Sequence, residues 1–251
     1  MLPVERHQQI LALVSERGVI SINELTETLG VSHMTIRRDL QKLEQQGAVL
    51  AVSGGVQSTE RIAIEPSHID KKAMHSQQKA LIGKLAAQQI PANSCIYLDA
   101  GTTTLALAYE ITDRHDLTVV TNDFVIAAWL LENSQCRLIH TGGTVCRENR
   151  SCVGDAAAQA LRHLFIDLAF ISASSWDLRG LSTPSEDKVA VKRAIVEASQ
   201  RCVLLSDISK YGKVATYLAV PISSFAMIIT ESALPDSVRD VLIERNITLL
   251  C

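Results

Sequence analysis

The alternation of apolar runs after residue 76 is the feature that most restricts how this chain can fold. Short β-prone runs alternate with helix-like runs almost to the last residue. The expected strands cover residues 95–98, 118–120, 137–140, 168–171, 201–205, 226–230 and 247–250. The expected helices cover residues 78–90, 104–111, 124–132, 156–164, 186–199 and 237–245. This alternation predicts an α/β fold with a mostly parallel sheet and helices on both faces. Because 47% of the residues are hydrophobic but only 4% aromatic, aliphatic side chains must fill its core.

The first 57 residues follow a different pattern, which predicts consecutive short helices. An amphipathic helix is expected over residues 4–17. Ser21 and Glu24 have the spacing of a capping box, which marks the start of a short second helix. Ser32 is placed to cap a longer third helix that stops at Gly47. A short helix, a tight turn and a longer helix have the spacing of a helix-turn-helix.

The segment after the third helix predicts a wing. Residues 48–57 contain two short β-prone runs around Ser53-Gly54-Gly55, which favours a hairpin joined directly to that helix. The first unit is therefore expected to be a small α+β winged helix-turn-helix domain. Its third helix carries polar and basic side chains that suit base edges and phosphates in a major groove. The alternative is an ordinary three-helix bundle, in which Arg37, Arg38 and Lys42 form a solvated face.

The charge of this unit does not indicate nucleic-acid binding. Residues 1–57 carry five Lys or Arg against six Asp or Glu, and the whole chain has a net charge of −3. Affinity for DNA must then come from the placement of charge and from several copies acting together. We therefore expect a homo-oligomer, either a dimer or a tetramer, on double-stranded operator DNA.

Polar loops follow four of the expected strands, and in parallel sheets such loops build the ligand site. The strongest runs from Asp99 to Thr104, where Gly101 lets the backbone approach a ligand and the start of a helix favours phosphate. Asp99 suits a ligand hydroxyl. Alternatively, Thr102 or Thr103 only caps the helix and Asp99 only closes a turn. The other loops lie at residues 121–123, 141–144 and 206–212, and their common edge favours one shared pocket.

The motifs of both units resemble the DeoR family of bacterial sugar-metabolism repressors. The T-x-R-R-D core at residues 35–39, followed by the Gly54-Gly55 wing, carries the first part of the resemblance. The second part rests on D-x-G-T-T-T, T-N, G-G, an Asp–Gly loop (Asp177 and Gly180), an acid followed by a lysine (Glu186 or Asp187, then Lys192) and D-x-S-K-x-G. The resemblance implies that Thr35, Arg37 and Arg38 contact DNA, while Asp39 orients an arginine. It also implies a phosphorylated sugar or sugar acid as effector.

The candidate sites combine these arguments. The expected DNA-binding residues are Ser32, His33, Thr35, Arg37, Arg38, Lys42 and Gly54. The expected effector-binding residues are Asp99, Gly101, Thr102, Thr103, Thr104, Asn122, Gly142, Gly143, Lys192 and Lys210. The threonine loop is assigned to a phosphate. An exposed cation with no ligand is the alternative for each lysine.

Two further classes of function remain as alternatives. The DeoR-type sensor domain is similar in fold to ribose-5-phosphate isomerase, so the chain could be an isomerase-like enzyme with a DNA-binding appendage. Those enzymes have an Asp-Gly-Ala-Asp-Glu run where this chain has residues 171–175, which contain no carboxylate to act as a base. Asp177 lies nearby, but one acid in a loop is weak support for an active site, so we expect no enzyme. The other alternative is an activator or nucleoid-type binder without a ligand.

The remaining patterns predict where the chain works and how it is divided. We expect a cytoplasmic protein without a membrane segment, because no apolar stretch is long enough to span one and the first residues do not form a signal peptide. The six cysteines include no C-x-x-C pair and are expected to be reduced. The sequence predicts no metal site and no cofactor. The predicted parts are a DNA-binding domain at residues 1–57, a linker at 58–75 and an effector-sensing domain at 76–251.

Overall fold

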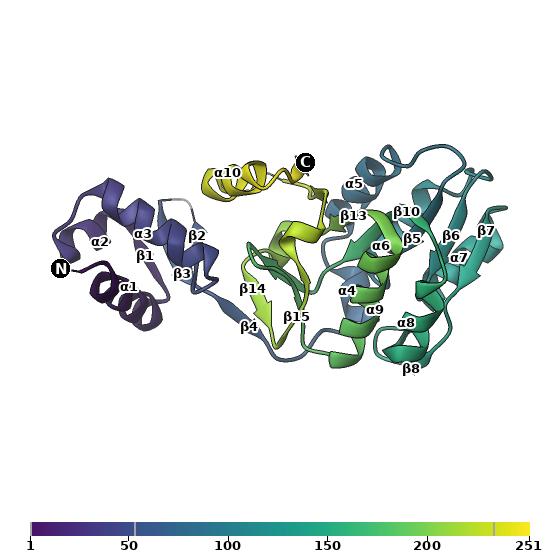
Figure 1. Cartoon of the computed structure of the whole chain (residues 1–251), viewed down its shortest axis with the longest axis horizontal. Coiled ribbons are helices and arrows are strands. Elements are labelled where there is room, and N and C mark those ends of the chain that lie inside the picture. The colour runs from purple at the N-terminus through teal and green to yellow at the C-terminus, as the bar shows by residue number, and fades with distance from the viewer. Residues whose placement is uncertain (1, 53, 233) are drawn as a thin grey trace.

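The N-terminal unit combines short helices with a small antiparallel sheet (Figure 1). It belongs to a computed structural model that describes residues 2–52, 54–232 and 234–251. Its elements are α1 (Pro3–Arg17), β1 (Val19–Ser21), α2 (Ile22–Leu29), α3 (His33–Gln45), β2 (Val49–Val52) and β3 (Gly55–Ser58). The helices and the β2–β3 hairpin confirm the prediction of a winged helix-turn-helix. Ser53, at the predicted turn, lies outside the described residues. The sheet has the order β1-β3-β2, and β1 was not predicted.

Local capping explains where these helices begin and end. The Ser21 hydroxyl accepts a hydrogen bond from the Glu24 N–H at 3.2 Å, and the Glu24 carboxylate accepts one from the Ser21 N–H at 2.9 Å. Both halves of the predicted capping box are therefore present. Gly30 ends α2 in the left-handed region, with φ of 64°. Apolar side chains from all three helices and from β3 close one core, including Ile10, Leu25, Ile36, Leu43 and Val56.

Residues 58–75, predicted as a linker, contain two short elements. These are β4 (Glu60–Ile62) and α4 (His68–Ala73). β4 pairs in parallel with β14 (Lys213–Ala215) of the larger unit. The segment is thus fastened to the sensor domain by backbone hydrogen bonds.

The larger unit is built on a parallel sheet. Among the described residues it has seven strands in the order β17-β16-β13-β10-β5-β6-β7. The strands are β5 (Cys95–Leu98), β6 (Thr118–Thr121), β7 (Arg137–His140), β10 (Ile166–Ser172), β13 (Ser199–Leu205), β16 (Met227–Ile229) and β17 (Thr248–Leu250). The helices are α5 (Ser76–Ala87), α6 (Thr102–Glu110), α7 (Phe124–Asn133), α8 (Gly154–Arg162), α9 (Glu186–Ala198) and α10 (Asp236–Glu244). All pairs between neighbouring strands are parallel, as predicted.

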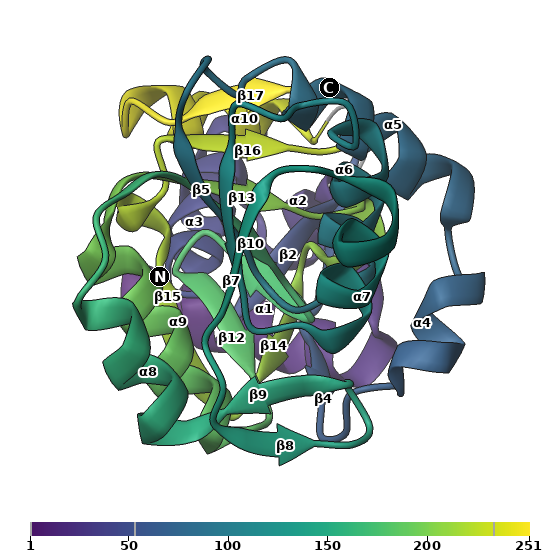
Figure 2. The same ribbon diagram turned by 90° about the vertical axis from the view of Figure 1, so that its right-hand side faces the viewer.

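Helices cover both faces of this sheet (Figure 2). Ile96 and Leu98 of β5 pack with apolar residues of α5, α6 and α7 in one core. Tyr97 points to the opposite face, into a second core with residues of α8, α9 and α10. Alternate side chains of each strand are therefore buried on opposite faces, which explains the nearly continuous apolar runs in the sequence.

Several short strands beyond the main sheet were not predicted. β11 (Ser175–Asp177), β12 (Gly180–Thr183) and β15 (Tyr217–Pro221) form a small antiparallel sheet. β8 (Thr144–Cys146) and β9 (Ser151–Val153) form a hairpin, and η1 (Ile208–Lys210) and η2 (Ile222–Ser224) are single turns. In Figure 1, β14 and β15 lie between the main sheet and the N-terminal unit. No helix within the described ranges has the length and apolar character needed to span a membrane.

Candidate DNA-binding surface and effector cavity

The predicted DNA contacts lie along α3, from its N-cap to Lys42, and on the wing. His33, Arg37, Arg38 and Lys42 are exposed on α3, and Gly54 is exposed in the wing. Ser32 and Thr35 have a capping role as well, because the Ser32 hydroxyl accepts the Thr35 N–H at 3.3 Å and lies 3.0 Å from the Thr35 hydroxyl. The four long polar side chains are thus free to reach a ligand outside the domain.

Asp39 orients an arginine, but that arginine is Arg6 of α1. The Asp39 carboxylate accepts hydrogen bonds from Arg6 at 2.5 and 3.2 Å and lies 2.9 Å from the His7 Nε2 atom. Burial opposes ionisation of this carboxyl, but Arg6 and His7 hold its pKa below the usual value. The T-x-R-R-D core therefore contains two exposed arginines and one aspartate that fixes α3 against α1.

A groove of about 920 Å³ lies between α3, which carries the predicted DNA contacts, and α10. Arg37, Arg38 and Gln41 line one side, and Asp236, Arg239 and Asp240 of α10 line the other. Two of the predicted DNA contacts, Arg37 and Arg38, therefore share a groove with charged residues of the larger unit. In Figure 1, α10 lies above the C-terminal part of the N-terminal unit.

A second, much smaller cavity lies at the carboxyl ends of β5, β6 and β10. It has a volume of about 20 Å³ and is lined by Glu65, Asp99, Ala100, Asn122, Ser151, Val153, Ser172, Ser174, Thr183, Lys188, Val191 and Lys192. Asp99 and Lys192 form a buried ion pair of 2.6 Å at its centre. The Asp99 Oδ2 atom also accepts hydrogen bonds from the N–H and the hydroxyl of Ser172, at 3.0 and 3.1 Å. We call this the effector cavity.

Asn122 joins the effector cavity to the β8–β9 hairpin. Its Oδ1 atom accepts the Tyr97 hydroxyl at 2.7 Å, and its Nδ2 atom donates to the Cys152 carbonyl at 2.8 Å. Burial raises the pKa of Tyr97 well above the usual value, so the phenol remains a donor. The amide therefore holds the hairpin over the ends of the strands.

The Asp99–Thr104 turn lies next to this cavity, and part of its hydrogen-bonding capacity is already used. The Gly101 N–H donates to Asp123 at 3.1 Å, and the Thr104 hydroxyl donates to the Asp99 and Gly101 carbonyls at 2.6 and 2.8 Å. Thr102 and Thr103 are each 8% exposed, and their hydroxyls are not among the fully buried groups of the described residues that lack a hydrogen-bond partner. Burial raises the pKa of Asp123 to about 6, against the effect of three N–H donors.

Of the predicted effector residues, Asp99, Asn122 and Lys192 line the cavity. The others lie outside its lining, namely Gly101, Thr102, Thr103, Thr104, Gly142, Gly143 and Lys210. Gly142 and Gly143 are in the turn between β7 and β8, with φ of 66° and 120°. A Cβ atom on Gly143 would lie 2.8 Å from the Ala157 Cβ, so this glycine allows close packing of the turn on α8. Lys210 is half-buried in η1, and no ion pair joins it to any described residue.

Four further polar residues line the cavity but were not predicted from the sequence, namely Glu65, Ser151, Ser172 and Lys188. Lys188 lies four residues before Lys192 on α9, so the helical spacing could have placed both ammonium groups on one face. Glu65 comes from the predicted linker and gives no such pattern. The effector cavity thus receives residues from the linker as well as from the sheet.

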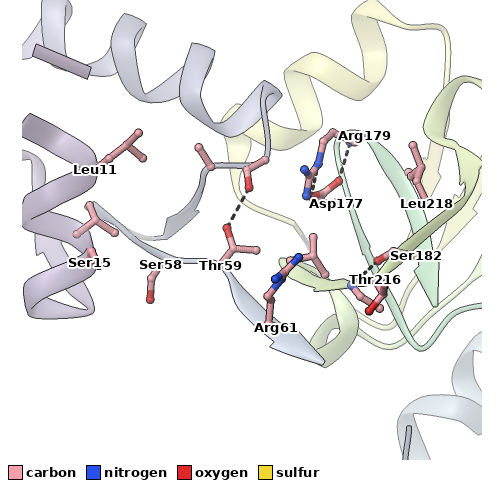
Figure 3. Close-up of a pocket in the computed structure, with 16 residues that line it drawn as sticks. Leu11, Ser15, Ser58, Thr59, Arg61, Asp177, Arg179, Ser182, Thr216 and Leu218 are labelled. Atoms are coloured by element: carbon pink, nitrogen blue, oxygen red, sulfur yellow. Dashed lines mark hydrogen bonds and ion pairs between the residues drawn. The ribbon is translucent and has the colours of Figure 1, made fainter. Parts of the chain in front are cut away.

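Asp177, the single acid in the enzyme alternative, belongs to a different groove. Its carboxylate accepts hydrogen bonds from the N–H and the guanidinium of Arg179, at 2.8 and 2.7 Å. Figure 3 shows both residues facing Thr59 and Arg61, in a groove of about 570 Å³ between the two units. Asp177 and Asp99 therefore line different cavities. Within the described parts of the chain, no group of three His, Cys, Asp or Glu side chains is arranged to hold a metal ion.

Comparison with known families agrees with this architecture. Residues 6–61 match the model of the DeoR-like helix-turn-helix domain, and residues 74–232 match that of the DeoR C terminal sensor domain. A DNA-binding domain joined to a sensor domain defines a transcriptional regulator. The chain belongs to the DeoR family.

Relatives that align with nearly all of this chain are also named as transcriptional regulators or repressors. An Escherichia coli K12 protein described as an uncharacterized HTH-type transcriptional regulator, YgbI, is 64% identical over 100% of this chain and 98% of its own length. The glycerol-3-phosphate regulon repressor of the same organism is 33% identical over 100% of both chains. A putative aga operon transcriptional repressor of E. coli O157:H7 is 32% identical over 92% of this chain and 87% of its own length. The expectation of a regulator and not an enzyme is therefore confirmed by the family.

Solved structures resemble the sensor domain only weakly. Ribose 5-phosphate isomerase A from Methanocaldococcus jannaschii aligns with 54% of this chain and 54% of its own, with a TM-score of 0.41 and 15% identity. A similarity of this size carries no argument about function.

Proposed function

We propose that the protein represses a carbohydrate-utilisation operon, and that a phosphorylated sugar or sugar acid in the effector cavity modulates its binding to operator DNA. The observation that carries the proposal is the buried Asp99–Lys192 pair at the ends of the parallel strands, close in the chain to the hydroxyls of Thr102 and Thr103 at the start of α6. Such hydroxyls at the first turn of a helix favour phosphate without adding charge. Lys192 and Asp99 suit the hydroxyl or acid groups of the same ligand.

The DNA-binding half of the proposal rests on the exposed side chains of α3. Arg37 and Arg38 can bond to base edges, and His33, Lys42 and the wing at Gly54 are placed to contact phosphates. The relatives that are named repressors of the glycerol-3-phosphate regulon and the aga operon support a role as repressor of a carbohydrate operon. A regulator of operator DNA works in the cytoplasm, as a dimer or tetramer that joins several weak contacts.

The volume of the effector cavity sets a condition on this mechanism. About 20 Å³ has room for a water molecule but not for a sugar phosphate. The elements around the cavity must therefore move when an effector binds. A ligand that prefers the opened arrangement can change the position of the winged helices, because the two states are coupled.

The affinity for operator DNA, measured with and without an effector, tests this proposal. Fluorescence anisotropy with the promoter DNA upstream of the protein's own operon is followed while phosphorylated sugars, sugar alcohols and sugar acids are added one by one. We expect one of them to change operator affinity, and Thr103→Val to bind operator normally but to lose that response. Thr248→Val, an exposed threonine of β17, is the matched control. A normal effector response in Thr103→Val would remove the threonine turn from the site.

A further inference from the structure

Glu65 reaches into the effector cavity from outside the sheet. It lies between β4 and α4, and its side chain is only 13% exposed. One carboxylate oxygen accepts a hydrogen bond from the Lys71 ammonium at 2.6 Å, and the other accepts one from the Lys188 ammonium. Lys71 belongs to α4 and Lys188 to α9. A single carboxylate thus bridges two cations that separate elements bring together.

The surroundings of Glu65 are positively charged. Lys71 and Lys188 hold the pKa of Glu65 at about 2 although burial opposes ionisation. Burial and then Lys71 and Arg150 lower the pKa of His68 to about 4. Without Glu65, two half-buried ammonium groups would face each other, which is unfavourable unless another anion is present.

The cavity also contains a polar group without a partner. The Ser151 hydroxyl is fully buried, lines the same cavity as Glu65 and Lys188, and has no hydrogen-bond partner in the described parts of the structure. Buried hydroxyls are nearly always bonded, so this one indicates a position that a ligand can use.

We propose that Lys71 and Lys188 form an anion-binding subsite of the effector cavity, and that Glu65 occupies it until an anionic group of the effector takes its place. The proposal rests on the proposed function, because it assigns one end of the same ligand. The group that the subsite takes is an oxyanion, either a carboxylate or a phosphate. Since Glu65 lines a cavity that is too small for a sugar phosphate, the ligand enters only when this side chain leaves.

Displacement of Glu65 acts on the connection between the two units. Glu65 follows the end of β4 by three residues, and β4 follows the wing strand β3 after Thr59 alone. β4 is also paired with β14 of the sensor domain. Release of the carboxylate therefore frees the segment that leads from the cavity to the wing.

Thermal unfolding in the presence of simple anions tests the subsite without a sugar or DNA. Wild type, Glu65→Gln and Glu60→Gln are unfolded in a low-salt buffer while inorganic phosphate, and separately acetate, is titrated at constant ionic strength. Glu60 is the matched control, because it is a linker carboxylate paired with Lys213 but 63% exposed. An anion that binds only the folded state raises the unfolding temperature as the site fills.

We expect Glu65→Gln to be less stable than Glu60→Gln without added anion and to recover with phosphate, with an apparent Kd at least ~10-fold below that of wild type. Recovery with acetate as well would identify a carboxylate site, and recovery with phosphate alone a phosphate site. Adding Lys188→Gln to Glu65→Gln should remove the response. If Glu65→Gln does not fold, Glu65→Asp replaces it, because the shorter side chain cannot reach both lysines. This variant should also bind phosphate with a lower apparent Kd than wild type.

Equal phosphate dependence in the Glu65 and Glu60 variants would overturn the subsite. The proposed function fails by a different result, namely that no phosphorylated sugar changes operator binding by the wild type. The failure of the subsite and the failure of the proposed function are therefore distinguishable.

Discussion

At the scale of single residues, the sensor domain depends on carboxylates that are buried beside cations. Asp99 was predicted to bind a ligand hydroxyl, but its Oδ2 atom already accepts hydrogen bonds from the Lys192 ammonium and the Ser172 N–H. The residue type and its place after a strand were predictable from the sequence. Its partners were not, because Lys192 is 93 positions away and its position depends on how α9 packs.

Removal of Asp99 should be costly for this reason. Asp99→Ala leaves the Lys192 ammonium buried without a counter-charge, so we expect a loss of about 3–5 kcal/mol in the free energy of unfolding. Urea denaturation measures it. Asp116→Ala is the control, because this aspartate is also paired with an arginine at 2.8 Å but in an exposed position, and its loss should be much smaller. Equal losses in the two variants would contradict the role of burial.

The pH dependence of stability should isolate Glu65. Its folded-state pKa of about 2 lies below the usual value of about 4.5, so its ionised form stabilises the folded state above that usual value. The contribution, about 3 kcal/mol, is lost as the pH falls from about 4.5 towards 2. The difference in unfolding free energy between wild type and Glu65→Gln should be constant above pH ~5.5 and shrink below pH ~4.5. Glu60→Gln should show no such change, and a difference that grows towards acid pH would contradict the assigned ion pairs.

At the scale of elements, apolar patterning decides what the sequence predicts. The helices and the strands of the parallel sheet, including the three-residue β16 and β17, were predicted with nearly correct bounds, because they are apolar runs in a regular alternation. β1, β4, β8 and β11 are just as short but contain polar or exposed residues, so no apolar run marks them in the sequence. These short strands position the linker, the hairpin over the effector cavity and the contact between the two units. The part of the site that was missed lies mostly on or beside them.

The exposed face of α3 gives a prediction at this scale. Arg37→Ala and Arg38→Ala should each weaken operator binding by about 1–3 kcal/mol, because each removes a charged contact to bases or phosphates. Arg17→Ala on α1 is a control, since this arginine is exposed but lies on another helix. Anisotropy titrations at fixed salt give the three affinities. Unchanged operator binding in both α3 variants would contradict the assignment of Arg37 and Arg38 to DNA contacts.

At the scale of the whole molecule, the loop after β13 connects the sheet to the wing. The Tyr211 hydroxyl donates to the buried Glu44 carboxylate of α3 at 3.1 Å, and Glu44 also accepts the Ala51 N–H of β2 at 2.9 Å. A Cβ atom on Gly212 would lie 2.1 Å from the Leu50 side chain, so the loop and the wing are in close contact. Tyr211 and Glu44 are 167 positions apart, and no local pattern of the sequence could predict that they meet.

Tyr211→Phe removes this hydrogen bond while keeping the ring that packs against Trp176 at 4.8 Å between centroids. We expect the amide hydrogens of β2 to exchange faster, because the sensor domain no longer holds Glu44 against the wing. Hydrogen exchange followed by mass spectrometry measures this. Tyr217→Phe, on β15, changes an exposed tyrosine in the same way and should leave β2 unaffected. Equal exchange in both variants would show that the contact does not stabilise the wing.

The charge of the N-terminal unit implies that several copies must bind DNA together. Residues 1–57 carry more acids than bases, so one copy can neutralise few phosphates and should bind DNA weakly. Two linked copies turn the second contact into an intramolecular event, which raises the affinity without new side chains. We expect sedimentation to give a dimer or larger, and footprinting to show two half-sites separated by about one helical turn of DNA or a multiple of it. In a homo-dimer, Arg37→Ala removes the same contact from both copies, so both half-sites should weaken together. A footprint that shrinks to one half-site in this variant would contradict a symmetric dimer. A monomer in solution that protects a single half-site would disprove it.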